Sequence, residues 1–228
     1  MADSLSESMY RAFFEEASPD RRNRATRFLK REAACRTIVV DCLVRYVVKR
    51  VTGFETDRLI LGKNEYGKPM IHNLDIHFNI SHSGEWAICA IDNNEIGVDI
   101  ESHRPIDIKI ADRFFSEKEI LFINRCKNED ERYEVFFKIW TLKESYIKSI
   151  GKGFSCPFDG FSCIPQDGGR RIEFNSYIES LPVKNFKMID IDPHFSCAIC
   201  GSEAILRMKP LVMTPESLFN RYKQLYHL

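Results

Sequence analysis

The stretch IGVDIES, residues 96–102, predicts a β-strand with two different faces. Successive side chains of a strand point to opposite sides, so the isoleucines and the valine share one face, and Gly97, Asp99 and Glu101 share the other. Gly97 leaves room for a ligand beside the carboxylates. Two carboxylates about 7 Å apart on one face either lie in solvent or bind a cation, because desolvated carboxylates repel each other. The strand alone leaves both alternatives open.

The neighbouring sequence places this strand in a mixed chain of helices and strands. IHFNI and WAICAI precede it, separated by the turns SHSG and DNN, which predicts an antiparallel meander over 76–101. Apolar residues at helical spacing predict a helix over 27–51. In FFSEKEILFI, Ser116 as N-cap and Glu119 form a capping box that begins another helix.

The remainder of the chain repeats this pattern of long helix and short strands. Residues 131–150 predict a second long helix that ends at Gly151 and Gly153. The stretch SHRP, which begins at residue 102, is typical of a linker, and TPESLFNRYKQLYHL at the end predicts a terminal helix. Further strands are expected near 158–164, 171–178, 185–191 and 195–200.

The expected fold class is therefore α+β, with two pseudo-symmetric halves, each a long helix packed on a small antiparallel sheet. The halves are residues 1–103 and residues 104–228, the second carrying a C-terminal extension.

Composition narrows the classes of function. The 228 residues contain 33 Lys and Arg against 33 Asp and Glu, so no net charge attracts nucleic acid or an anionic membrane. No run approaches the roughly 18 apolar residues of a membrane span, and the start MADSLSES lacks the form of a secretion signal. Eight scattered cysteines are typical of reduced thiols in a cytosol, and we expect Cys197 and Cys200 of the C-x-x-C to pack in the core. The prediction is a cytoplasmic protein.

A second group of charged residues lies on the long helix with the sequence FFKIWTLKESYIKSIGKG, residues 136–153. Trp140, Glu144 and Lys148 are one turn apart and share a face, with Lys143 beside them. A solvated Glu–Lys pair is one interpretation. The other makes Glu144 a third oxygen ligand of a magnesium ion and Lys148 a cation beside a phosphate.

Basic residues gather in PDRRNRATRFLKRE, residues 19–32, of an otherwise neutral chain. This segment is either a solvated helix face or a phosphate clamp, since Arg and Lys bind phosphate oxygens through charge-assisted hydrogen bonds. Arg36 and Thr37 would extend such a clamp. Lys68 and His82 each lie in a turn signal and are either turn residues or phosphate contacts.

Taken in order, EYGKP, HFNISHSG, IGVDIE, FFSEKE and WTLKESYIKSIGKG resemble the surfactin-type 4′-phosphopantetheinyl transferases, over roughly residues 18–200. The most specific parts are G-V-D-I-E and W-x-x-K-E-S-x-x-K. The resemblance implies a monomer with coenzyme A in the cleft between two halves. It also implies transfer of the phosphopantetheine arm to a serine of an apo peptidyl, acyl or aryl carrier protein, with release of adenosine 3′,5′-bisphosphate.

The resemblance also implies roles for individual residues. Asp99, Glu101 and Glu144 would bind Mg²⁺, and Lys148 would stabilise or protonate the leaving phosphate. Either Glu144 or Glu119 would deprotonate the serine. The family pattern has lysine at the positions of Arg21 and Arg24, so the geometry around the 3′-phosphate can differ here. The residues implied to hold coenzyme A are Arg21, Arg24, Arg36, Thr37, Lys68, Ser81, His82, Lys143 and Lys148.

Three questions stay open on the sequence. A magnesium-dependent phosphatase or nuclease could use the same carboxylates, and a coenzyme A-binding module could lack catalysis. The natural carrier is also open. Among the candidate pathways we favour nonribosomal peptide or polyketide synthetases, and hence antibiotic biosynthesis. The region from Ile106 to Phe122 would dock the carrier, which requires one or two of its apolar side chains to be exposed.

Overall fold

The computed structural model describes residues 5–226. The helices are α1 (Glu7–Glu16), α2 (Pro19–Ala25), α3 (Arg31–Thr52), α4 (Ala111–Phe114), α5 (Glu117–Asn124), α6 (Glu129–Ile150) and α7 (Pro215–Tyr226). The strands are β1 (Leu61–Lys63), β2 (Pro69–Ile71), β3 (His77–Ser83), β4 (Trp86–Asp92), β5 (Gly97–Ser102), β6 (Phe161–Gln166), β7 (Arg171–Ser176), β8 (Asn185–Met188) and β9 (Phe195–Gly201). Short 3-10 turns connect several of them.

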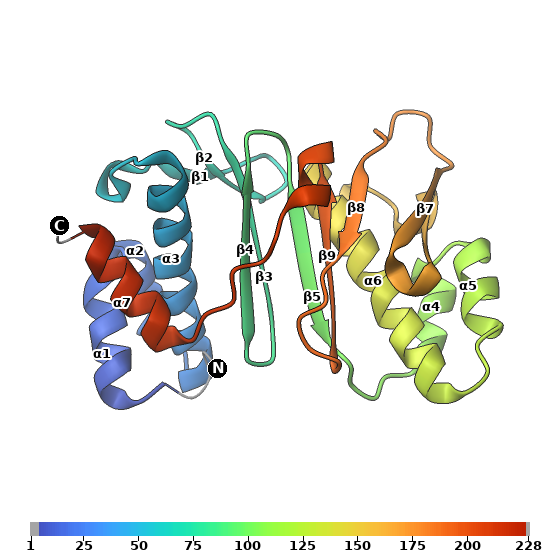
Figure 1. Cartoon of the computed structure of the whole chain (residues 1–228), viewed down its shortest axis with the longest axis horizontal. Helices are drawn as coiled ribbons and strands as arrows, with labels where there is room; N and C mark the ends of the chain where they lie inside the picture. Colours follow the sequence, from blue (N-terminus) through green and yellow to red (C-terminus); the bar gives the residue numbers. More distant parts are fainter. Residues whose placement is uncertain (1–4, 227–228) are drawn as a thin grey trace.

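The elements form three blocks along the longest axis of the molecule (Figure 1). Helices α1, α2, α3 and α7 make one end, the strands β3, β4, β5, β9 and β8 make the middle, and α4 to α6 with β6 and β7 make the other end. Long helices thus pack against small antiparallel sheets. This arrangement confirms the predicted α+β class.

Local signals set the ends of the helices as predicted. The Ser116 hydroxyl accepts from the N–H of Glu119, and the Glu119 carboxylate accepts from the N–H of Ser116. This is the expected capping box at the start of α5. Helix α6 ends at Gly151, whose φ of 69° is left-handed. Helix α3 begins at Arg31 rather than at residue 27, because Lys30 is extended and the preceding basic residues form the separate helix α2. Helix α1 was not predicted.

The strand pairing differs from the expected meander. β3 and β4 form an antiparallel hairpin, but β5 pairs with β9, with Gly97 opposite Cys200, in the three-stranded sheet β5–β9–β8. β5 still lies beside β3 because side chains of β3 bond to its backbone: the N–H of Val98 donates to Asn79 Oδ1 at 2.8 Å. The meander over 76–101 is therefore replaced by a hairpin and a separate sheet joined through side chains.

The two faces of β5 are as the sequence predicted. Val98 and Ile100 are fully buried in a core with Cys197 and Ile199, whereas Asp99 lies on the opposite face of the strand. Cys197 and Cys200 belong to different hydrophobic cores, one on each side of β9, and none of the eight cysteines, all of which lie within residues 5–226, forms a disulfide bond. The C-x-x-C is therefore part of the core.

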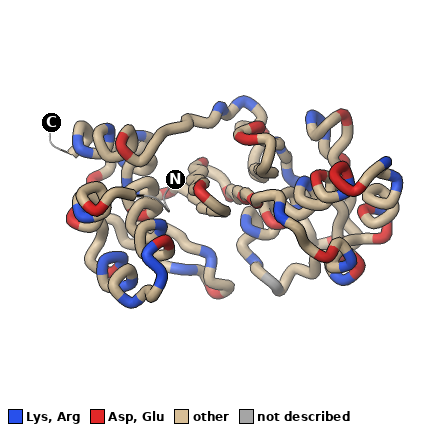
Figure 2. Tube along the Cα trace, turned by 90° about the horizontal axis from the view of Figure 1, so that it is seen from below, with Lys and Arg blue, Asp and Glu red and all other residues tan. Residues whose placement is uncertain are grey.

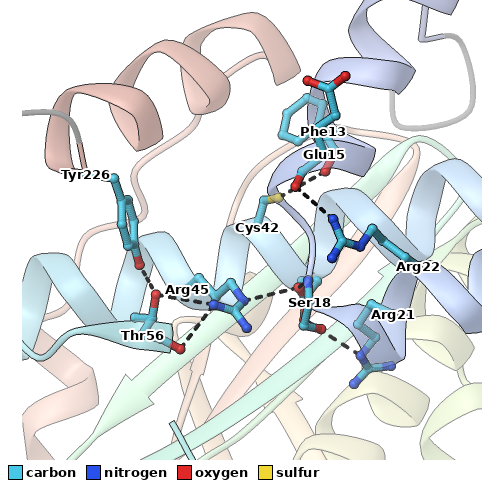
Figure 3. A network of polar contacts seen from close by, with 10 residues as sticks. Phe13, Glu15, Ser18, Arg21, Arg22, Cys42, Arg45, Thr56 and Tyr226 are labelled. Carbon is cyan, nitrogen blue, oxygen red and sulfur yellow. Dashed lines mark hydrogen bonds and ion pairs between the residues drawn. The ribbon is translucent and has the colours of Figure 1, made fainter. Parts of the chain in front are cut away.

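The C-terminal helix α7 returns to the opposite end of the molecule and packs on α3 (Figure 1). Leu218 and Tyr222 are buried there against Phe13 and Cys42. The last described residue, Tyr226, contacts the hydroxyl of Thr56 (Figure 3). The chain therefore crosses back over the central strands between residues 208 and 214.

The division of the chain at residue 103 stays a prediction, and its outer ends extend beyond the described residues. β5 precedes residue 103 yet forms its hydrogen-bonded ladder with β9, which follows it. Within residues 5–226, no helix combines the length and the apolar character needed to cross a bilayer.

Candidate active site

Four of the charged residues singled out in the sequence lie where β3, β5 and α6 come together: Asp99, Glu101, Glu144 and Lys148. Gly97 allows this meeting: a Cβ atom at this position would lie 2.0 Å from the carbonyl oxygen of Ser145 and 2.4 Å from the amide nitrogen of Ser149. The space beside Gly97 is therefore taken by the backbone of α6 and not by a ligand. Close packing of α6 on β5 brings Glu144 and Lys148 to the carboxylate face of the strand.

Asp99 is the centre of this arrangement. It is only 2% exposed, and its Oδ1 atom accepts hydrogen bonds from Lys148 Nζ at 2.6 Å and from Ser81 Oγ at 2.8 Å. Lys148 also donates to Ser81 Oγ at 3.2 Å, so the three side chains contact one another. The second oxygen, Oδ2, is buried without a hydrogen-bond partner. A buried carboxylate oxygen of this kind is costly unless a cation or water binds it.

Burial raises the pKa of all three carboxyl groups on this face. Burial raises the pKa of Glu144 to about 7, and the charges of Asp99 and Glu101 add to the effect. Burial and the Asp99 charge also raise the pKa of Glu101. Burial raises the pKa of Asp99, while Lys148 opposes the shift. When ionised, the three carboxylates carry three negative charges, which the single positive charge of Lys148 does not neutralise.

This donor set fits a hard divalent cation. Magnesium prefers carboxylate oxygens, and a divalent charge would offset both the burial and the repulsion that raise these pKa values. Asp99 Oδ2 offers one buried oxygen that no protein group uses. Over the described chain, residues 5–226, no three His, Cys, Asp or Glu side chains are already arranged to hold a metal ion. Asp99 Oδ1 is instead occupied by Lys148.

The predicted phosphate contacts on α2, α3 and β3 divide into two groups. Arg36 on α3 and His82 on β3 face each other, with Nη1 and Nδ1 3.5 Å apart. Thr37 lies beside Arg36 on the helix and bonds to its own backbone, the carbonyl of Ala33. His82 is next to Ser81 on the β3–β4 hairpin, and Arg36 and Thr37 lie on α3, which packs against that hairpin.

The basic residues of α2 lie farther along the first block of helices. Arg21 is 3.8 Å from the buried carboxylate of Asp41, which also accepts from Ser18 and Arg45 (Figure 3). Arg24 is exposed and lies over the ring of Phe28 at 5.9 Å. Figure 2 shows several Lys and Arg segments together on this part of the molecule. Arg21 therefore has a structural partner, whereas Arg24 faces solvent.

Lys68, on the β1–β2 hairpin, contacts the backbone at the start of β5 and at the end of α6. Its Nζ donates to the carbonyl oxygens of Ser149 at 3.0 Å and of Ile96 at 3.1 Å. Burial lowers its pKa to about 8. The predicted phosphate lysine thus holds the start of β5 against the end of α6 in this structure.

Glu119 and Lys143 are not brought to the site. Both side chains are 0% exposed, and Lys143 Nζ lies 2.9 Å and 2.8 Å from the two carboxylate oxygens of Glu119. Lys143 also donates to the carbonyl of Phe161 at 2.6 Å. The pair joins α5, α6 and β6 inside the protein, so neither side chain can contact a substrate in this geometry. This corrects the expectation that Glu119 is a candidate base and that Lys143 contacts coenzyme A.

Sequence reasoning missed Ser83, which belongs to the site. Its Oγ donates to Glu101 Oε2 at 3.3 Å and accepts from the N–H of Ser102 at 3.0 Å. The alternation of polar side chains in NISHS, residues 79–83, is a signal that could have found it, because Asn79, Ser81 and Ser83 share one face of a strand.

A cavity of about 920 Å³ lies elsewhere, between α3, β4 and residues 208–215. Its walls are largely aliphatic, with Leu43, Ile88 and Ile189 among the lining residues, and none of the predicted site residues lines it. We therefore do not place the reaction in this cavity, because the groups that could perform chemistry lie at β3, β5 and α6.

Comparisons with known proteins show the family to which the chain belongs. The profile of the 4′-phosphopantetheinyl transferase superfamily matches residues 95–200, and the profile described as 4′-phosphopantetheinyl transferase, N-terminal, matches residues 5–94. The chain is 40% identical over 200 residues to 4′-phosphopantetheinyl transferase Sfp of Bacillus subtilis strain 168, which covers 87% of this chain and 88% of that protein.

Two other relatives extend the comparison. The chain is 42% identical to 4′-phosphopantetheinyl transferase gsp of Aneurinibacillus migulanus, over 63% of this chain and 60% of that protein. It is 30% identical to 4′-phosphopantetheinyl transferase psf-1 of Bacillus pumilus, over 89% of this chain and 86% of that protein. With identity of this level along most of its length, the chain belongs to the 4′-phosphopantetheinyl transferase superfamily.

Proposed function

We propose that this protein transfers the 4′-phosphopantetheine arm of coenzyme A to a serine of an apo carrier protein, with Mg²⁺ bound at Asp99, Glu101 and Glu144. The observation that carries the proposal is the contact of Lys148 with the buried Asp99 at 2.6 Å, on a face shared with two more carboxylates. A cation next to an acidic metal seat is what transfer of a phosphoryl group between two oxygens needs.

The reaction forms one bond and breaks another at the β-phosphorus of coenzyme A. The serine oxygen bonds to this phosphorus, the bond to the bridging oxygen breaks, and adenosine 3′,5′-bisphosphate leaves. Magnesium, when bound, neutralises charge on the pyrophosphate. Lys148 stabilises the leaving phosphate, because its side chain is 28% exposed and lies at the edge of the carboxylate face.

We assign the role of general base to Glu144. Its carboxyl is half-buried on the carboxylate face, beside Asp99 and Lys148, where the metal and the substrate phosphates would meet. It accepts the proton that the serine hydroxyl loses, and its two oxygens allow one to contact the metal. Glu119, the alternative base, is sealed in the core with Lys143.

Arg36 and His82 support a nucleotide site next to the carboxylates. Their side chains meet between α3 and the end of β3, on the strand that carries Ser81. Arg24, exposed on α2, adds positive charge at this end of the molecule. We assign the phosphates of the nucleotide to these cations, because guanidinium groups bind phosphate oxygens in pairs.

The carrier protein has a candidate docking surface on the segment from Ile106 to Phe122. Leu121 is 57% exposed and Ile110 is 39% exposed, whereas Phe115 is buried. Arg113 and Lys118 are exposed on the same segment, and so are Asp112 and Glu117. The exposed apolar side chains would contact the carrier, and the two cations would pair with acidic residues of the helix that carrier proteins present.

The remaining expectations concern the setting of the enzyme. We assign it to the cytoplasm as a monomer that acts on carrier domains of nonribosomal peptide or polyketide synthetases, and hence in antibiotic biosynthesis. The balanced charge and the absence of disulfide bonds among the described cysteines support this setting.

A variant of the metal seat tests the proposal. Asp99→Asn should abolish transfer and Mg²⁺ binding but leave the fold intact, because the side chain lies on the ligand face of β5. Asp57→Asn is the matched control, since Asp57 is an exposed carboxylate far from α6 in sequence. Transfer is followed by the mass of an apo carrier domain, metal binding by calorimetry and folding by circular dichroism. Near wild-type transfer by a folded Asp99→Asn would refute the metal assignment.

A further inference from the structure

The site is built across a seam between the β3–β4 hairpin and the β5–β9–β8 sheet. β5 is an edge strand of its sheet, and the N–H groups on its free edge need acceptors. Three side chains of β3 supply them: Asn79 accepts from Val98 at 2.8 Å, Ser81 from Ile100 at 3.4 Å and Ser83 from Ser102 at 3.0 Å. The order of these contacts makes the two strands parallel.

Two of the three seam residues have a second function that Asn79 lacks. Ser81 Oγ donates to Asp99 at 2.8 Å, and Ser83 Oγ donates to Glu101 at 3.3 Å. The Ser83 hydroxyl is also 3.4 Å from that of Ser102, but a charged acceptor makes the stronger hydrogen bond. Each serine thus joins a carboxylate of β5 to the neighbouring strand.

Both serines are buried, so their hydroxyl groups bond to protein groups and not to solvent. Ser81 and Ser83 are 8% and 9% exposed. The Ser81 hydroxyl donates its proton to Asp99 and accepts from Ile100 and Lys148, so its hydrogen-bonding capacity is full. It therefore has no proton to offer a phosphate while Asp99 is held.

We propose that Ser81 and Ser83 are positioning residues that orient Asp99 and Glu101 for the divalent cation from the neighbouring strand. This inference rests on the proposed function, because it concerns the same metal seat. A serine donating to one carboxylate oxygen fixes the rotation of the carboxylate and directs its other oxygen away from the donor. For Asp99 the free oxygen is the unpartnered Oδ2.

The effect is larger for Glu101 than its single hydrogen bond indicates. Glutamate has one more rotatable bond than aspartate, and Glu101 is only half-buried, so fewer contacts restrict it. Loss of an outer hydrogen-bond partner of a metal ligand typically weakens metal affinity by about 10–100-fold. We expect Ser83→Ala to fall in this range.

The experiment measures Mn²⁺ and Mg²⁺ affinity directly, by calorimetry and by the electron paramagnetic resonance of free Mn²⁺, with saturating coenzyme A and no carrier. Ser83→Ala should weaken metal binding by about 10–100-fold, and Ser83→Thr, which keeps the hydroxyl, should restore most of it. Ser81→Ala is a second variant that acts through Asp99. Asn79→Ala is the matched control: it removes a seam bond but no carboxylate contact, so it should lower the melting temperature and keep metal affinity.

The outcomes separate this inference from the proposed function. If the wild type binds neither metal, the proposed metal seat fails and the inference fails with it. If the wild type binds metal and a folded Ser83→Ala or Ser81→Ala binds it equally well, only the positioning role is refuted. Equal weakening in Asn79→Ala and Ser83→Ala would also refute it, because the effect would then belong to the seam as a whole.

Discussion

The buried ion pair of Glu119 and Lys143 gives the sharpest prediction about stability and also decides between two candidate bases. Lys143 Nζ lies 2.8 Å and 2.9 Å from the carboxylate oxygens, and both side chains are 0% exposed. Replacing one member of such a pair leaves the other charge uncompensated, which costs about 3–5 kcal/mol of the free energy of unfolding.

The two single variants should differ because the partners left behind differ. Glu119→Gln leaves the Lys143 ammonium with the Phe161 carbonyl at 2.6 Å and the face of that ring at 4.3 Å. Lys143→Met leaves a carboxylate that still accepts from Ser116 N, Ser116 Oγ and Cys163 N. We expect Glu119→Gln to cost about 4–5 kcal/mol and Lys143→Met about 3 kcal/mol, at the two ends of the usual range.

The assay is urea unfolding of both single variants and the double variant, followed by circular dichroism. The double variant should be more stable than the sum of the single effects predicts by about 1–3 kcal/mol, because it contains no stranded charge. Glu119→Gln should retain transfer by the molecules that remain folded at low temperature. A Glu119→Gln protein as stable as the wild type that transfers nothing would refute the structural role and make Glu119 the base.

Three other predictions follow from single side chains. Lys148→Ala should lower kcat far more than it weakens coenzyme A binding, and weaker binding with unchanged kcat would make Lys148 a simple anchor. Burial lowers the pKa of Lys68 from 10.5 to about 8, so between these values the native lysine has lost a proton that the unfolded chain keeps. The stability of the wild type relative to Lys68→Met should therefore rise with pH from about 8 to about 10, as measured by urea unfolding, and a flat difference would contradict the assignment. Leu218→Ala should cost about 2–5 kcal/mol because α7 buries this side chain on α3, whereas Leu211→Ala, at an exposed position, should cost less than about 0.5 kcal/mol; equal effects would mean that the docking of α7 contributes nothing.

The sequence predicts those parts of the structure that depend on neighbouring residues. The capping box of Ser116 and Glu119 and the left-handed Gly151 set helix ends through contacts a few residues long. The alternation in IGVDIES places the aliphatic side chains in a core and the carboxylates on the other face, because side-chain direction in a strand is local.

The parts that failed depend on residues distant in the chain. Asp99 pairs with Ala198 across the β5–β9 ladder, and no local signal selects β9 over the adjacent β4 as partner. Lys143 is next to Glu144 in sequence, yet the helix turns it inward to Glu119. The sequence alone suggests space for a ligand beside Gly97. The backbone of α6 fills that space through a tertiary contact, which has no local signal. The position of α7 on α3 has the same cause.

The central claim is metal-dependent transfer of the phosphopantetheine arm to a carrier serine, and intact-mass spectrometry tests it directly. An apo peptidyl carrier domain is incubated with the protein, coenzyme A and Mg²⁺, with and without a chelator. The account predicts that the carrier gains the mass of one phosphopantetheine arm and that the chelator abolishes the gain. Cleavage of coenzyme A with an unchanged carrier would indicate a hydrolase, and bound coenzyme A with several unchanged carriers would indicate a binding module; either result would contradict the account.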